Sequence, residues 1–261
     1  MPRAVRNEGF YYDGDTGAWH PSVTSIVGVV GGGAELSNWY GRLGVDEANR
    51  VRDAAARVGS NVHALIRWSL THKPVDISRL EPSNLIRIGY QAWEIWATRH
   101  LLRPILAEQY LLHPGYLYAG TMDFYGWVST CDNPKCCGVA GIERLEVIDW
   151  KTSKSLRKKE QMQVPAYANV LMAHGFPVNG VRLLRIGNVD PDGELLGTQS
   201  KDLTDQFDFL FQRFLDAKRL FEWMKTPPRS TPKWLPNRKP IPKFSIKLIG
   251  EAKIPEALCL T

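Results

Sequence analysis

The stretch Val147-Ile148-Asp149-Trp150-Lys151 decides which fold the sequence predicts. Its apolar, β-branched start favours a buried strand, and residues two apart on a strand point to the same face. Asp149 and Lys151 therefore project together at the end of that strand, a carboxylate beside an ammonium group. A buried ion pair contributes little to stability, so the pair taken alone is more typical of a structural role than of a functional one.

Outward from this strand, the spacing of apolar residues predicts helices upstream and a mixture of strands and helices around it. Apolar residues recur at steps of three and four over two long regions, and these predict helices. Runs rich in aromatic and β-branched residues predict strands. The predicted helices cover 35–70, 83–102, 161–174 and 204–224, and the predicted strands cover 104–113, 116–129, 141–151, 178–189 and 194–198. The alternation indicates an α/β fold with a central sheet flanked by helices.

Length and charge divide the chain into a body and a tail. With 261 residues it fits one large domain with an appendage. We expect a single domain over 1–225, with a helical portion over about 20–102 and a core over about 103–225. Residues 226–261 hold seven Lys/Arg, two Glu and seven of the 17 prolines. This tail carries a net charge of +5 out of +6, which leaves the body close to neutral.

Several classes of protein are excluded by the composition. No run of 18 apolar residues exists, so no membrane span is expected, and the first residues lack the apolar stretch of a secretory signal. Four cysteines are too few for a disulfide scaffold and favour a reducing, intracellular setting, with the cytoplasm as the expected location. The phosphate-binding loop of nucleotide-driven motors is also missing.

Acidic residues on two further predicted strands give Asp149 possible partners. Asp123 follows Gly120, a glycine that permits close backbone approach, and Glu108 lies on the preceding strand. Carboxylates from adjacent strands can share a divalent cation such as Mg²⁺, which prefers oxygen ligands. Downstream, Gln163 and Tyr167 are four residues apart and share a face of the next predicted helix.

At this point the sequence resembles a known family. The order Glu108, Gly120-Thr-Met-Asp123, Ile148-Asp149-Trp-Lys151-Thr-Ser153 and Gln163-x3-Tyr167 is similar to the RecB-type nuclease branch of the PD-(D/E)XK superfamily. Within it, the stand-alone phage and mitochondrial genome-maintenance exonucleases are the most similar in pattern. Gly59-x3-His63 and the opening Val23-Thr-Ser-Ile26 also resemble this branch. The resemblance covers about residues 20–175 and includes nothing in the tail.

The resemblance implies a restriction-endonuclease-like core, a mixed central sheet flanked by helices, and a metal-dependent deoxyribonuclease. Asp123, Asp149, Glu108 and His63 would bind Mg²⁺ or Mn²⁺. Lys151 would orient or deprotonate the attacking water, and a depressed pKa is expected for it next to a metal.

The implied partner is DNA, as single strands or ends, in recombination, repair or replication in a phage or bacterial setting. Gln163 and Tyr167 would shape the site and contact the DNA. A structure-specific endonuclease with the same site, or a nucleic-acid-binding assembly protein without catalysis, remain alternatives.

Some residues keep two interpretations at this stage. His63 lies among apolar residues and could be a core histidine, and Glu108 could have a structural role. Thr152, Ser153 and Lys154 could bind a phosphate or form a polar exit from the strand. The predicted loop that holds Cys131, Cys136 and Cys137 could bind zinc with Cys259 or His113 as a fourth ligand, although free thiols are favoured because adjacent cysteines chelate one ion awkwardly. An iron–sulphur cluster is not expected, because in the relatives that carry one the cysteines flank the nuclease motifs.

Overall fold

The structure is a computed structural model of the chain. It describes residues 5–14, 16–31, 33–71, 76–78, 80–81, 83–129, 143–189 and 195–227. The proline-rich tail after residue 227 and the predicted cysteine loop at 130–142 lie outside the described residues.

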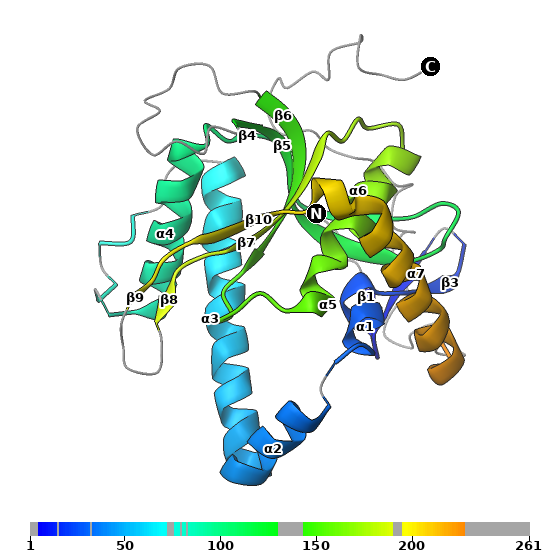
Figure 1. Ribbon diagram of the computed structural model, residues 1–261, viewed down its shortest axis with the longest axis horizontal. Coiled ribbons are helices and arrows are strands. Elements are labelled where there is room, and N and C mark those ends of the chain that lie inside the picture. The colour runs from blue at the N-terminus through cyan, green and yellow to red at the C-terminus, as the bar shows by residue number, and fades with distance from the viewer. Residues whose placement is uncertain are drawn as a thin grey trace.

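A five-stranded mixed sheet forms the centre of the protein (Figure 1). Its strands are β4 (Arg103–Leu112), β5 (Ala119–Ser129), β6 (Glu143–Lys151), β7 (Gly180–Arg185) and β10 (Gln199–Asp202), in the order β10-β7-β6-β5-β4. β6 and β7 are parallel, whereas the other neighbouring pairs are antiparallel. A short hairpin of β8 (Asn188–Val189) and β9 (Leu195–Leu196) lies between β7 and β10 in the chain. The predicted α/β class is confirmed.

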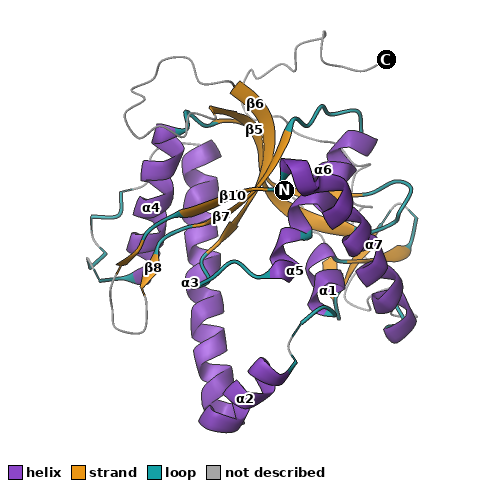
Figure 2. Ribbon diagram, viewed as in Figure 1, coloured by secondary structure: helices purple, strands orange, loops and turns teal. Residues whose placement is uncertain are grey.

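Helices cover both faces of this sheet (Figure 2). One face packs against α3 (Val45–Thr71) and α4 (Leu85–Arg99) through a cluster that includes Ile66, Trp93 and Trp150. The other face packs against α1 (Val23–Gly28), α6 (Gln163–Ala173) and α7 (Phe207–Met224), which follows a short 3-10 turn at Thr204–Gln206. Alternate residues of β6 serve the two cores, since Val147 belongs to one cluster and Ile148 to the other.

A small antiparallel sheet near the amino terminus was not predicted. It consists of β1 (Val5–Asn7), β2 (Phe10–Asp13) and β3 (Ala18–Pro21). A parallel bridge between Ser22 and Ala119 joins its end to β5 of the central sheet. Its strands have only three or four residues each, too short for the period-two alternation to stand out in the sequence.

The predicted helix over 35–70 is two helices. α2 (Ala34–Leu43) ends at Gly44, whose φ of 77° favours glycine, and α3 begins at the next residue. In Figure 1, α2 and the first half of α3 project away from the sheet. Residues 50–57 of α3 are exposed around the whole circumference of the helix, so this part of it is not packed on the body.

α6 begins at Gln163, two residues after the predicted start. Pro165 is the third residue of the helix, inside the first turn, where a missing backbone N–H is tolerated. A four-residue helix, α5 (Lys158–Gln161), precedes it and connects it to β6. No helix in the described ranges has the length and apolar character that crossing a membrane would need.

Gly120 allows a tyrosine ring to lie against β5. A Cβ atom at this position would stand 2.6 Å from Cε1 of Tyr167 and 3.2 Å from Cγ2 of Val23. The ring of Tyr167 is buried, and Val23 belongs to the same core. The close approach inferred from the sequence is therefore confirmed, and its partner is the aromatic ring of α6.

We predict that Gly120→Ala lowers the free energy of unfolding by about 1–3 kcal/mol, because the added methyl group overpacks this contact. The matched control is Gly41→Ala on α2, where an added Cβ has no atom within 4 Å. That change should be neutral or stabilise by up to about 1 kcal/mol, since alanine is the better helix former. Urea denaturation of both variants measures the effect; equal midpoints would show that Tyr167 does not hold this position.

Candidate metal centre

The centre of the site is a carboxylate placed where two strands part. β5 and β6 pair from Ser129–Glu143 as far as Phe124–Ile148. One residue further along β5, Oδ2 of Asp123 accepts the backbone N–H of Trp150 at 2.8 Å. The side chain thus satisfies a backbone donor at the end of the ladder. Asp123 is 6% exposed, so its carboxylate is held in a nearly dry position.

Glu108 reaches the same point through an irregular backbone. It lies on β4 between Ala107, which pairs with Phe124, and Gln109, which pairs with Met122. Its φ of 49° is in the left-handed region, which residues other than glycine adopt rarely. Such irregularities re-aim side chains near functional sites, and the carboxylate of Glu108 here points to α3.

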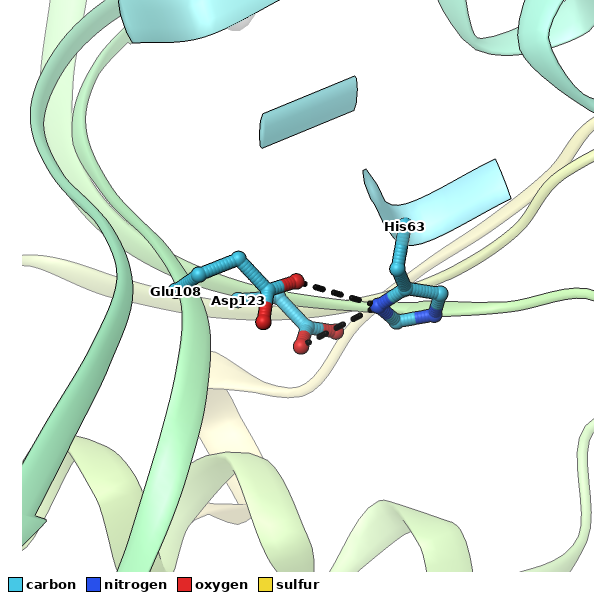
Figure 3. Close-up of side chains that lie close together, drawn as sticks. All are labelled: His63, Glu108 and Asp123. Carbon is cyan, nitrogen blue, oxygen red and sulfur yellow. Dashed lines mark hydrogen bonds and ion pairs between the residues drawn. The ribbon is translucent and has the colours of Figure 1, made fainter. Parts of the chain in front are cut away.

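His63 approaches from the helical layer. Its Nδ1 lies 3.2 Å from Oε1 of Glu108 and 3.5 Å from Oδ1 of Asp123 (Figure 3). One turn earlier, a Cβ at Gly59 would stand 2.9 Å from Oγ1 of Thr152. The absence of a side chain at Gly59 therefore lets α3 lie close to the chain that leaves β6, which explains the spacing of Gly59 and His63.

Asp149 and Lys151 form an ion pair next to this group. Nζ of Lys151 contacts Oδ2 of Asp149, and both side chains project from the end of β6 as the alternation predicted. Asp149 is buried and Lys151 is partly exposed. Oxygen and nitrogen atoms of His63, Glu108 and Asp123 lie within 4.8 Å of one another, and Asp149 is outside that group.

Charge coupling across the site changes the pKa values of its members. Burial opposes protonation of His63, but the carboxylates of Asp123 and Glu108 outweigh it and raise the pKa of His63 to about 10. Burial raises the pKa of Glu108, whereas for Asp123 the nearby His63 and Lys151 outweigh burial and lower the pKa. For Asp149, burial dominates over the Lys151 charge and raises the pKa to about 7.

Without a metal, the pKa of Lys151 shifts in the other direction, and its depression next to a metal stays a prediction. Burial of the ammonium group does act to lower it. The charges of Asp149 and Asp123 outweigh that effect, and the pKa of Lys151 is raised. Lys151 is therefore a cation at neutral pH, suited to donating hydrogen bonds to an anion or a water molecule.

The buried start of α6 borders the site on the face of the sheet that packs against α1, α6 and α7. Tyr167 and Gln163 lie one turn apart on this helix, and both are buried. Burial, followed by the charges of Asp149 and Asp123, raises the pKa of Tyr167 well above its usual value, so its hydroxyl keeps its proton. Oε1 of Gln163 is buried without a hydrogen-bond partner in the described part of the chain.

The residues predicted to bind a phosphate lie on the chain that leaves β6. Thr152 is next to Gly59, Oγ of Ser153 donates to the carbonyl of Ser155 at 2.9 Å, and Lys154 is exposed. The predicted zinc ligands Cys131, Cys136, Cys137 and Cys259 lie outside the described residues.

His113 does not fit the role of an additional zinc ligand. Its Nδ1 accepts backbone N–H groups from Gly115 and Tyr116 at 3.0 and 2.9 Å, and its Nε2 bonds to Oδ1 of Asn169 at 2.8 Å. Both ring nitrogens are therefore already occupied by protein groups.

Glu160 is a residue near the site that sequence reasoning missed. It is buried, its Oε2 accepts the backbone N–H of Arg157 at 2.8 Å, and its charge helps to raise the pKa of Lys151. An acidic residue in the first turn of a helix is a recognisable capping signal. That signal indicates the start of α5 but not the proximity to Lys151.

The donor set fits a hard divalent cation. Two carboxylates and one imidazole converge on one point, with Asp149 as a third acidic residue beside them, and this set suits Mg²⁺ or Mn²⁺ better than a soft metal. The three ligands come from α3, β4 and β5, so the group forms only when the two layers are packed together.

Comparisons with known proteins add little to this geometry. No protein-family model and no curated protein matches the chain. Among solved structures, the crystal structure of SSO0001 matches with 16% identity over 66% of this chain and 77% of that chain, at a TM-score of 0.28. A likeness at this level carries no argument about function.

We predict that His63 is an imidazolium at pH 8 in protein without metal, because its pKa of about 10 lies above that pH. Saturating Mg²⁺ should displace this proton, since a ligating imidazole nitrogen must be deprotonated. His113 is an internal control: burial lowers its pKa, so it should stay neutral at pH 7 with or without Mg²⁺. The ring ¹⁵N chemical shifts report both states; a His63 that titrates near 6.5 would contradict the coupling.

Proposed function

We propose that the protein is a metal-dependent deoxyribonuclease of the RecB-type branch, with a restriction-endonuclease-like core. The observation that carries the proposal is the convergence of His63, Glu108 and Asp123 beside the Asp149–Lys151 pair. Phosphodiester hydrolysis needs charge neutralisation on the phosphate and a nucleophile close to hydroxide. Carboxylates that hold a cation, with a lysine next to them, are suited to both needs.

The roles of the side chains follow from their positions. When bound, Mg²⁺ or Mn²⁺ would polarise a phosphoryl oxygen and lower the pKa of a coordinated water. Asp123, Glu108 and His63 would hold the ion, and Asp149 would add a third carboxylate beside them. Lys151, a cation at neutral pH, would orient the attacking water and stabilise the negative charge that develops on the phosphate.

Asp149 is a candidate acceptor for the proton of the attacking water. Burial raises its pKa to about 7, which is close to the optimum for proton transfer at neutral pH. Asp149 also contacts Lys151, so a water molecule beside the pair would meet both a base and a hydrogen-bond donor. Tyr167 and Gln163 lie on α6, where they would line the substrate-binding surface.

An exonuclease acting on single strands or DNA ends is the preferred form of the activity. The protein would work in recombination, repair or replication. An endonuclease with the same site and a non-catalytic DNA-binding protein are the alternatives. A circular and a linear single strand together separate all three. An exonuclease cleaves only the linear strand, an endonuclease cleaves both, and a binding protein cleaves neither.

We expect Asp123→Asn to abolish cleavage of linear single-stranded DNA in Mg²⁺ or Mn²⁺, because it removes a charged ligand while keeping an acceptor for the N–H of Trp150. EDTA should have the same effect on the wild type. Asp205→Asn is the matched control, since Asp205 is exposed at the start of the 3-10 turn. Gel analysis of end-labelled DNA measures the products.

The proposed site would be excluded if purified Asp123→Asn cleaved at the wild-type rate with Mg²⁺. Cleavage by the wild type that persists in EDTA would exclude the metal mechanism. Thermal unfolding of both aspartate variants shows whether a loss of activity comes from a loss of fold.

For Lys151→Ala, single-turnover cleavage should slow by on the order of 10²- to 10³-fold, the usual cost of removing one positioned donor that stabilises charge in the transition state. DNA affinity should change much less, because one charge among several is a small part of phosphate binding. Lys218→Ala is the matched control: Lys218 pairs with Glu222 on α7, away from the sheet end. Equal losses in affinity and rate would make Lys151 a binding residue instead.

A further inference from the structure

A short basic segment follows the last strand residue of the site. Lys154, Arg157, Lys158 and Lys159 fall within six residues of the chain that connects β6 to α6. The first three are exposed and Lys159 is partly buried. None of the four side chains forms an ion pair with another residue in the described part of the protein. We call these four residues the basic segment.

The segment is held in place at both ends. At its start, Thr152 lies against Gly59, one turn from His63 on α3. At its end, Glu160 accepts the backbone N–H of Arg157. Leu156, inside the segment, packs against the core formed with α1, α6 and α7. The cations are therefore presented from an anchored loop that begins directly after Lys151.

A second contact places the segment beside the linker between α1 and α2. A Cβ at Gly31 would lie 3.4 Å from Cδ of Lys159. The loop thus runs from the His63 turn of α3 to the α1–α2 linker, across one border of the site.

The charge of the site itself creates a need for such a segment. Three acidic side chains, Glu108, Asp123 and Asp149, face two cations, His63 and Lys151, so the site offers a polyanionic substrate no net positive charge. Attraction of such a substrate therefore requires positive charge along its path. A single divalent ion would neutralise the group locally but would not attract the neighbouring phosphates.

Basic residues elsewhere are used differently. On α7, Arg213, Lys218 and Arg219 each pair with an acidic residue three or four positions away, namely Asp216 or Glu222. Such pairs are typical of a solvated helix surface. The basic segment has comparable charge without these partners, in a stretch that borders the site.

We propose that the basic segment binds the phosphates next to the scissile one in a single strand of nucleic acid. The inference rests on the proposed nuclease function and adds to it a site that extends beyond one phosphodiester. It follows that the protein should act far better on a polynucleotide than on a small phosphodiester. Each phosphate contact on a single strand contributes about 0.7 to the log–log salt dependence of binding.

The test replaces the three exposed cations by alanine, K154A/R157A/K158A, and keeps Lys159 because its stem contacts the linker. Binding of a fluorescent 20-nucleotide single strand is measured by anisotropy in EDTA over a range of salt concentrations. The salt slope should fall by about 2 units, and affinity at about 0.1 M salt by at least tenfold. Turnover of bis(p-nitrophenyl) phosphate with Mn²⁺ should fall by a smaller factor than the affinity for the strand, because this substrate has no neighbouring phosphate for the segment to contact.

The matched control, R213A/K218A/R219A on α7, removes the same charge and should leave the salt slope unchanged. A basic-segment variant with the wild-type slope, while the wild type binds and cleaves DNA, would overturn this inference alone. Loss of slope in a protein whose wild type cleaves nothing would support the phosphate contacts and overturn the catalytic proposal. Equal losses in both triple variants would show a general charge effect and overturn the inference.

Discussion

The structure depends on how buried negative charge is balanced where α3 meets the sheet. Glu108, Asp123 and Asp149 are withdrawn from water to different degrees, and desolvating a carboxylate is costly unless it is paired. In the absence of metal, His63 and Lys151 supply the opposite charges. This arrangement explains why the pKa of His63 rises to about 10 and why that of Lys151 rises instead of falling. It also leaves an excess of negative charge, which a divalent cation would remove.

Two departures from regular sheet geometry create the site. β5 and β6 stop pairing before Asp123, so its carboxylate takes the N–H of Trp150. Glu108 adopts a left-handed backbone conformation in β4, and its side chain then meets His63. In a regular ladder, the backbone N–H of Trp150 would donate to a backbone carbonyl of β5 instead of to the side chain of Asp123. The irregular backbone is therefore part of the chemistry, as is common where strands supply functional groups.

Much of the architecture follows from local patterns in the sequence. Apolar periodicity predicted α4 and α7 within a few residues, because each of them buries one face. Runs of apolar, aromatic and β-branched residues predicted β4, β5 and β6, of which β5 and β6 are buried on both faces. The break at Gly44, the three short amino-terminal strands and the edge strand β10 were missed. A single glycine within a helical pattern is a weak signal, and strands of three or four residues are too short to show alternation.

The candidate site was predictable in its members but not in its coupling. The motif order indicated His63 and Asp123, and strand alternation placed Asp149 beside Lys151. Two features depend on tertiary packing that no local pattern encodes. These are the grouping of His63 with Glu108 and Asp123 apart from Asp149, and the direction of the shift in the pKa of Lys151.

We propose that His63, Glu108 and Asp123 together bind one divalent cation. Anomalous diffraction from crystals soaked in Mn²⁺ tests this most directly, because the peak locates the metal without reference to activity. We expect a peak within about 2.5 Å of Nδ1 of His63 and of one oxygen from each carboxylate. A peak at other residues, or clear density for the direct His63–Glu108 contact in crystals that hold Mn²⁺ elsewhere, would contradict it.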